Sequence, residues 1–121
     1  AYAEDIRIID TELVAAGRWL ATETPAPAVV GTHDIGAIGY FSRRHLVDTA
    51  GLISPEVIPF IRDEPQLLKF LEQNGVSYFV TFPSWYPQLV RDPRLVPVYR
   101  SPYPWSLAAG GDQVVIYETH W

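Results

Sequence analysis

The strongest constraint on the fold of this chain is the alternation of short strand-like runs with stretches of helical periodicity. Five runs have the length and flanking turn residues of strands, and they occupy residues 28–32, 43–48, 76–82, 95–100 and 113–120. Helical patterns separate the first three runs. Strands joined through helices pair in parallel by right-handed crossovers, so the alternation predicts a parallel core. The last two runs have no helical pattern between them, which predicts an antiparallel pair at one edge.

The helical stretches are marked by apolar spacing and by their end residues. Apolar side chains three and four residues apart predict an amphipathic helix over 3–22, and residues 24–27 end it because proline cannot continue a helix. A short helix is predicted within 33–41. Further helical pieces open at Ser54, an N-cap residue followed by proline, and at residue 63, from which a helix runs to residue 74. The stripe of the first helix consists of Ile6, Ile9, Leu13, Ala16 and Leu20.

These elements predict an α/β fold with a single domain over residues 1–121. The expected architecture is a small sandwich with helices packed on a mixed sheet of about five strands. That sheet has a parallel core and an antiparallel C-terminal edge pair. The length is that of one domain, and 48% hydrophobic with 19% charged residues is typical of a globular chain. The Pro-rich stretch 83–93 is predicted as a surface loop with at most one helical turn, and 101–112 as a long loop.

Composition excludes several classes of function. The formal net charge of −5 argues against nucleic acid as a partner, because such proteins carry a basic patch. The absence of cysteine excludes disulfides, thiol catalysis and thiolate metal sites. No run of 18 apolar residues is present, so no transmembrane segment is predicted, and no signal peptide is visible. The chain has no methionine, so we expect it to be a segment cut from a longer chain or a processed product.

Three glycines surround the turn that follows the first predicted strand, at Gly31, Gly36 and Gly39. A glycine-rich turn at this place can present backbone N–H groups to a phosphate, which makes Gly36 a candidate ligand contact. The dinucleotide fingerprint is incomplete, because Gly36 and Gly39 supply only its last two positions and the Lys-Ser/Thr of a phosphate loop is absent. The alternative, which we favour, is that both glycines allow close packing of a helix on a strand.

Two carboxylates, Asp34 and Asp48, are expected at the carboxyl ends of neighbouring strands, where ligands bind in open α/β sheets. Together they could divide general acid and general base roles, and His33 and His45 could join them as metal ligands. The alternative, which we favour, is structural: Asp34 caps the short helix, and Asp48 fixes the following turn through local hydrogen bonds. No G-x-S-x-G nucleophile motif accompanies them.

Aromatic residues gather in the two proline-containing loops, at Trp85 and Tyr86 and at Tyr103 and Trp105. Rigid exposed rings bury area at little entropic cost, which suits contact with carbohydrate, lipid headgroups or protein. The alternative is that these rings fold back and cover the core of a small domain.

A resemblance to a known family rests mainly on two segments, D-I-G-A-I-G-Y-F at 34–41 and V-D-T-A-G-L at 47–52. Shorter matches are W-L-A at 19–21, T-P at 24–25 and Y-F-V at 78–80. Together they resemble the bacterial polytopic glycosyltransferases of the GT-C type, which are similar to the dolichyl-phosphate-mannose–protein mannosyltransferases. The resemblance covers most of the chain.

The resemblance implies an accessory, non-catalytic domain of a membrane enzyme that uses a polyprenyl-phosphate sugar. Such domains follow the last membrane helix on the extracytoplasmic face of the bacterial cell membrane. The implied partners are the membrane-embedded part of the same polypeptide and a lipid-linked sugar or glycan acceptor. The catalytic acid of the family lies in an early outer loop, to which no position here corresponds, so we assign no catalytic residue, metal or cofactor. The ligand or interface candidates are Asp34, Gly36, Tyr40, Asp48, Trp85, Tyr86 and Trp105.

Two other functions remain open from the residues alone. The first is a small stand-alone hydrolase, dependent on a metal or on acid/base catalysis, built on Asp34, Asp48 and His33. The second is a carbohydrate- or protein-binding module that uses the aromatic loops.

Overall fold

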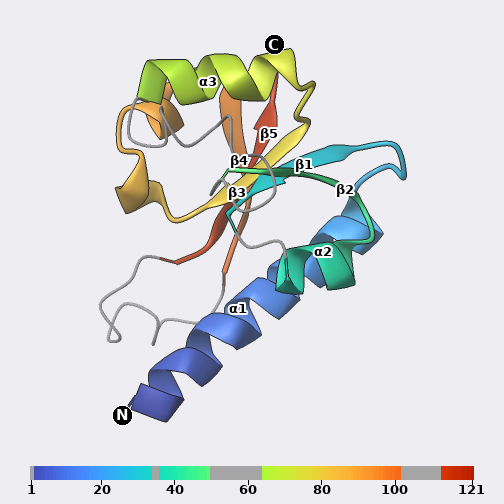
Figure 1. Cartoon of the computed structure of the whole chain (residues 1–121), viewed down its shortest axis with the longest axis vertical. Helices are drawn as coiled ribbons and strands as arrows, with labels where there is room; N and C mark the ends of the chain where they lie inside the picture. The colour runs from blue at the N-terminus through green and yellow to red at the C-terminus, as the bar shows by residue number, and fades with distance from the viewer. Residues whose placement is uncertain (1, 34–35, 50–63, 102–112) are drawn as a thin grey trace.

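The computed structural model describes residues 2–33, 36–49, 64–101 and 113–121, with side chains from residue 13 onward except that of Ser84. Within this part the chain forms three helices and five strands (Figure 1). The helices are α1 (Tyr2–Glu23), α2 (Ala37–Ser42) and α3 (Glu64–Gln73). The strands are β1 (Val29–Thr32), β2 (His45–Asp48), β3 (Tyr78–Thr81), β4 (Leu95–Arg100) and β5 (Val115–Thr119). The predicted helical piece at Ser54 and the predicted loop 101–112 lie outside the described residues, apart from Ser101.

The five strands form one mixed sheet in the order β2-β1-β3-β5-β4. β1 pairs in parallel with β2 and with β3, while β5 is antiparallel to both β3 and β4. The predicted fold class is therefore confirmed, including the parallel core and the antiparallel C-terminal pair at one edge. The sequence pattern did not specify which strand of the edge pair lies next to the parallel core. In the structure it is β5, which pairs with β3.

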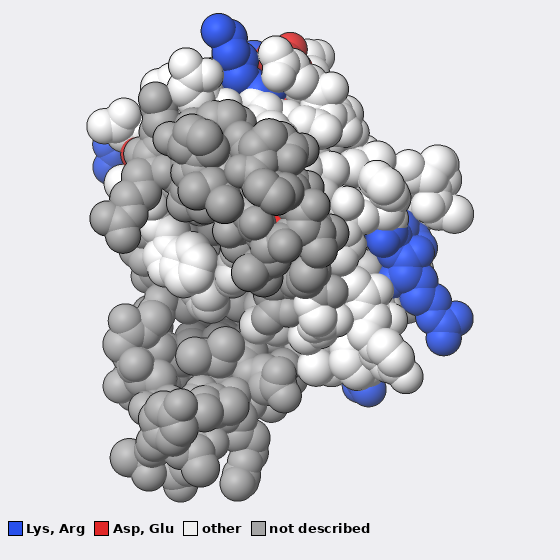
Figure 2. Space-filling view, viewed as in Figure 1, with Lys and Arg blue, Asp and Glu red and all other residues white. Residues whose placement is uncertain are grey.

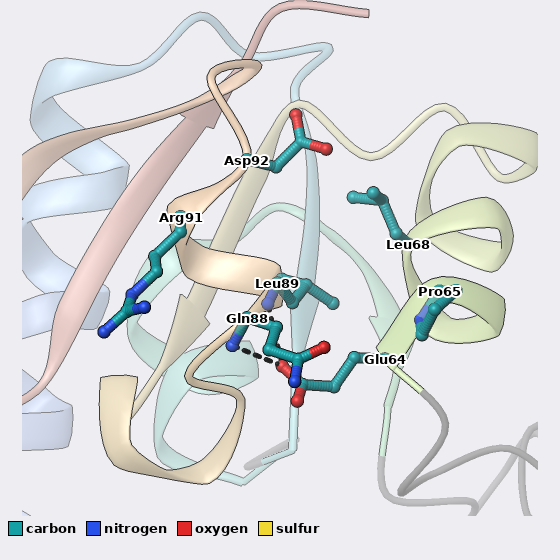
Figure 3. A pocket seen from close by; sticks show the side chains of 7 residues that line it. All are labelled: Glu64, Pro65, Leu68, Gln88, Leu89, Arg91 and Asp92. Atoms are coloured by element: carbon teal, nitrogen blue, oxygen red, sulfur yellow. Dashed lines mark hydrogen bonds between the residues drawn. The ribbon is translucent and has the colours of Figure 1, made fainter.

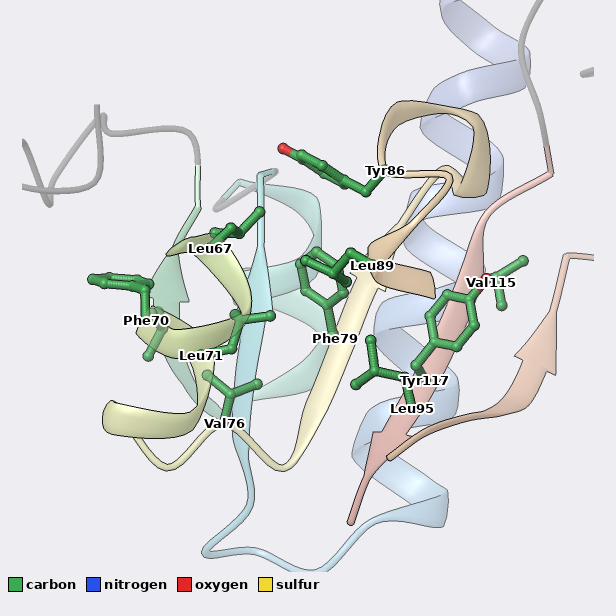
Figure 4. Close-up of a cluster of buried hydrophobic side chains, with 11 residues drawn as sticks. Leu67, Phe70, Leu71, Val76, Phe79, Tyr86, Leu89, Leu95, Val115 and Tyr117 are labelled. Carbon is green, nitrogen blue, oxygen red and sulfur yellow. The ribbon is translucent and has the colours of Figure 1, made fainter. Parts of the chain in front are cut away.

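Helices cover both faces of the sheet, with α1 and α2 on one face and α3 on the other (Figure 1). Each face has its own hydrophobic cluster. The described residues of the α1 stripe, Leu13, Ala16 and Leu20, are all buried, as their spacing predicts. The cluster beneath α3 is drawn in Figure 4 and consists of Val47, Leu67, Phe70, Leu71, Val76, Phe79, Tyr86, Leu89, Leu95, Val115 and Tyr117.

Two glycines set the close approach of elements on the α1 and α2 face. A Cβ atom on Gly17 of α1 would lie 2.9 Å from the Phe41 Cβ atom and 3.3 Å from the Ala37 carbonyl oxygen in α2. A Cβ atom on Gly39 of α2 would lie 2.8 Å from the Leu46 Cδ1 atom in β2. Gly39 therefore allows the close helix–strand packing proposed for it, and Gly17 does the same between the two helices.

The strands β2 and β3 each begin two residues later than predicted, for local reasons. β2 begins at His45 instead of residue 43, because Arg43 ends α2 in the left-handed conformation with a φ of 56°. β3 begins at Tyr78, because the Val76 N–H still donates to the Leu71 carbonyl at the end of α3. Gly75, with a φ of 65°, makes that turn possible. The loop after β3 contains two short 3-10 turns, Pro83–Trp85 and Leu89–Arg91, where at most one turn was predicted.

Candidate functional site

The carboxyl ends of the three parallel strands meet at one edge of the sheet, which we call the carboxyl edge. β2, β1 and β3 end there at Asp48, Thr32 and Thr81. The chain passes from β1 to β2 through α2 on one face, and from β2 to β3 by way of α3 on the other face. The winding therefore reverses between β1 and β3. In open α/β sheets, ligands bind outside the carboxyl ends of the strands at such a reversal.

Buried polar side chains lie at the base of the carboxyl edge. Thr32, Asp48, Thr49 and Thr81 are each at most 1% exposed. The Thr49 N–H donates to the Thr32 carbonyl at 3.0 Å, which holds the turn after β2 against the end of β1. Asp48 is engaged by a neighbouring group, as a buried carboxylate must be. The Asp48 side chain does not reach solvent, so its role at the carboxyl edge is to support the structure from inside the fold.

Three rings stand directly beyond the strand ends, from His33 after β1 and from Phe82 and Trp85 after β3. The His33 and Trp85 ring centroids lie 4.5 Å apart, and those of Phe82 lie 5.6 Å from His33 and 5.1 Å from Trp85. Pro83 opens the 3-10 turn, and the Trp85 N–H donates to the Phe82 carbonyl at 3.0 Å, which fixes the start of the loop. We call these three residues the edge cluster. Phe82 is buried, whereas Trp85 is 53% exposed, so the cluster offers an aromatic surface to a ligand.

Of the four predicted acid, base or metal-ligand residues, the structure describes three, His33, His45 and Asp48, and it separates His45 from Asp48. His45 begins β2 and is exposed, whereas Asp48 ends the same strand, so about 10 Å of extended chain separates the two. Asp34 lies outside the described residues. Among the described side chains, no three His, Asp or Glu residues are grouped closely enough to hold a metal ion.

The other predicted ligand or interface residues are distributed over different regions. Tyr86 follows Trp85 but turns into the cluster beneath α3, where it is 7% exposed and its ring centroid is 6.0 Å from that of Phe79. Burial raises the pKa of the Tyr86 phenol, and the nearby Glu64 carboxylate raises it further. Gly36 occupies the N-cap position of α2 and is exposed. Trp105 lies outside the described residues.

A shallow cleft of about 290 Å³ lies between α3 and the 3-10 turn Leu89–Arg91 (Figure 3). One oxygen of the Glu64 carboxylate accepts the N–H groups of Gln88 and Leu89, at 2.9 and 2.7 Å. This carboxylate therefore joins the start of α3 to the loop after β3, as Figure 3 shows by its dashed lines. The Asp92 carboxylate, which also lines the cleft, accepts two hydrogen bonds from the Arg94 guanidinium. The cleft is lined by Glu64, Pro65, Leu68, Gln88, Leu89, Arg91 and Asp92.

A second cleft, of about 640 Å³, lies between α1 and α2 and was not predicted from the sequence. It brings together three arginines and the exposed Tyr40, which was a predicted ligand or interface residue. The available signal was the adjacent pair Arg43 and Arg44, which follows Tyr40 and Phe41 after one serine. Arg18, however, comes from the distant helix α1, and only the packing of α1 on α2 places it here. We call this the arginine cleft, and it is lined by Arg18, Ala21, Thr22, Tyr40, Phe41, Arg43 and Arg44.

Comparison with known proteins defines a family without defining a function. No described helix combines the length and apolar character needed to cross a membrane. No curated protein and no solved structure matches the chain. A family model described as "Domain of unknown function (DUF8728)" matches residues 1–117, which is nearly the whole chain. The chain therefore belongs to this family.

Proposed function

We propose that the chain is an accessory, non-catalytic domain that binds a carbohydrate-bearing ligand at its carboxyl edge. The observation that carries the proposal is the half-exposed indole of Trp85, packed on His33 and Phe82 beyond the ends of β1 and β3. A fixed aromatic face with a nearby imidazole suits a sugar ring, whose C–H face packs on the indole while its hydroxyl groups hydrogen-bond.

The place of this ligand in a larger reaction follows from the resemblance to GT-C glycosyltransferases. In the proposed assembly the chain lies on the extracytoplasmic face of the membrane, beside the membrane-embedded part of the same polypeptide. It contacts the lipid-linked sugar or the glycan acceptor, and the membrane part performs the transfer. The burial of Asp48 supports a non-catalytic role for this carboxylate, because a general acid or base must reach its substrate.

The binding claim is tested by calorimetry with a panel of mono- and oligosaccharides that includes a short-chain polyprenyl-phosphate sugar. We expect at least one panel member to bind, and Trp85→Ala to weaken that binding at least tenfold. Trp121→Ala is the matched control, because this indole is also partly exposed and its Nε1 donates to the Val76 carbonyl, outside the edge cluster. Equal binding by the two variants, or no binding by the parent chain, would refute the site.

The accessory claim has a separate test. The purified 121-residue chain is incubated with a polyprenyl-phosphate sugar and a glycan or peptide acceptor, and transfer is followed by mass spectrometry of the acceptor. We expect no product. Transfer by the chain alone would show that it carries its own catalytic machinery.

A further inference from the structure

The arginine cleft concentrates positive charge on a chain that is acidic overall. The chain has nine Lys and Arg residues against fourteen Asp and Glu residues. Three of these nine cations, Arg18, Arg43 and Arg44, line this one cleft, and no acidic side chain is among the described residues that line it. In Figure 2, blue side chains project together where Figure 1 draws α2 and the end of α1, with no red visible beside them.

One of the three cations is held in place by the fold. The Arg44 guanidinium donates to the carbonyl oxygens of Ala21 and Thr24 at 3.0 and 2.7 Å, and to that of Ser42 at 3.3 Å. Its Nε atom also donates to the Thr24 hydroxyl at 3.1 Å. The positive charge sits at the carboxyl end of α1, where the helix dipole favours it. Arg44 thus supplies a fixed positive charge at the base of the cleft.

The other two cations are available to a ligand. Arg18 lies over the Phe41 ring, with its Cζ atom 5.2 Å from the ring centroid, and Arg43 lies at the end of α2. Both are exposed, and neither forms an ion pair with any described carboxylate. Arginine carries five N–H donors in a planar fork that matches the oxygen atoms of a phosphate group.

Two further features support a binding role for this cleft. Arg43 is the one described non-glycine residue with a positive φ, at 56°, a conformation that costs about 1–2 kcal/mol for a residue with a Cβ atom. Such strain concentrates at functional sites. Tyr40 stands at the same cleft with 77% of its surface exposed and its ring edge-on to Phe41 at 4.9 Å, so its hydroxyl group can reach a ligand.

We propose that the arginine cleft binds a phosphate mono- or diester, with Arg18 and Arg43 closing on its oxygen atoms and Arg44 providing the fixed charge beneath. The volume of about 640 Å³ is within the range of small-molecule sites. This proposal does not depend on the function proposed for the carboxyl edge, because none of the cleft residues belongs to the edge cluster.

The test compares two double variants that lose the same charge. Arg18→Gln with Arg43→Gln empties the cleft of its exposed cations, while Lys69→Gln with Arg91→Gln removes two exposed cations on the other side of the sheet. Binding of glycerol phosphate is followed by NMR of the backbone amides of residues 37–44. Binding to vesicles is measured by co-sedimentation, with phosphatidylglycerol against phosphatidylcholine. Thermal unfolding establishes that both variants remain folded.

We expect the parent chain to bind at least one phosphate probe, and the cleft variant to bind it at least tenfold more weakly than the control variant. Binding of glycerol phosphate identifies a soluble phosphate ester as sufficient, whereas binding to phosphatidylglycerol vesicles alone identifies a lipid headgroup. Failure of both probes, or equal losses in the two double variants, would overturn the proposal.

Discussion

At the residue scale, Arg43 has a left-handed backbone conformation and also carries one of the charges of the proposed phosphate site. Its left-handed backbone ends α2 and lets the chain turn toward β2, a position where glycine is normally favoured. An arginine at this position places a guanidinium at the rim of the arginine cleft. The backbone strain and the exposed charge therefore belong to the same residue. Substitutions that remove the charge with or without the Cβ atom distinguish their effects on stability.

Arg43→Gly should stabilise the chain. Relief of the left-handed conformation gains about 1–2 kcal/mol, and the greater entropy of glycine in the unfolded chain removes about 0.5–1 kcal/mol, which leaves a net gain of roughly 0.5–1 kcal/mol. Urea denaturation measures the change. Arg43→Ala is the control, since it removes the same charge but keeps the Cβ atom, and it should give no gain. Equal gains in both variants would show that charge, and not backbone strain, is responsible.

Two buried phenols make stability depend on alkaline pH. Burial raises the pKa of Tyr86, with a further contribution from Glu64, and burial also raises the pKa of Tyr78, with Glu118 adding to it. A raised pKa means that the folded chain holds the proton more tightly than the unfolded chain. The contribution of these two phenols to the free energy of unfolding should therefore be constant below about pH 10 and fall as pH rises through the folded pKa values.

Tyr86→Phe should make this alkaline decline shallower, because it removes one of the two linked protons while leaving a ring of nearly the same shape. The measurement is the free energy of unfolding from urea titrations at pH values from 8 to 11. A decline as steep as that of the parent chain would show that Tyr86 does not contribute to it.

At the element scale, the packing of α1 and α2 on the sheet depends on close contacts at glycines as well as on the apolar stripe of α1. The stripe of α1 could be predicted because its spacing is helical, and the parallel core because helices separate the first three strands. The contact of α1 with α2 could not be predicted, since nothing local to Gly17 indicates that Phe41 approaches it within van der Waals distance. The position of β5 beside β3 could not be predicted from the sequence either, because strand order depends on packing between distant segments.

Gly17→Ala should destabilise the chain although alanine is the better helix former. The propensity gain is about 1 kcal/mol, whereas overpacking costs typically about 1–3 kcal/mol, and the blocking atoms here belong to the start of the Phe41 side chain and to backbone. We expect a net loss of about 1 kcal/mol in urea denaturation. Gly39→Ala is the comparison, because its Cβ atom meets only the end of the Leu46 side chain, which can rotate away. Its loss should be smaller, and the reverse order would contradict the α1–α2 contact.

At the scale of the whole molecule, the two proposed binding sites lie in separate regions. The carboxyl edge presents the edge cluster above buried polar side chains, and the arginine cleft lies between the helices of one face. A site at the carboxyl ends of the strands was predicted from Asp34 and Asp48, and Trp85 was predicted as an interface residue of a separate loop. The packing of Trp85 on His33 could not be predicted. The inward turn of Tyr86 and the burial of Asp48 could not be predicted either, because a sequence pattern does not determine which side a loop or strand-end side chain faces.

The central claim is that the carboxyl edge is a carbohydrate site centred on Trp85. The most direct measurement is an NMR titration of the ¹⁵N-labelled chain with the tightest-binding sugar of the panel, following the indole Nε1–H resonances. The account predicts that the Trp85 resonance shifts with saturation. The resonances of Trp19, which packs on Tyr99, and of Trp121, at the C-terminus, should stay in place. A Trp85 resonance that does not move at saturation, or equal shifts at Trp85, Trp19 and Trp121, would contradict the account.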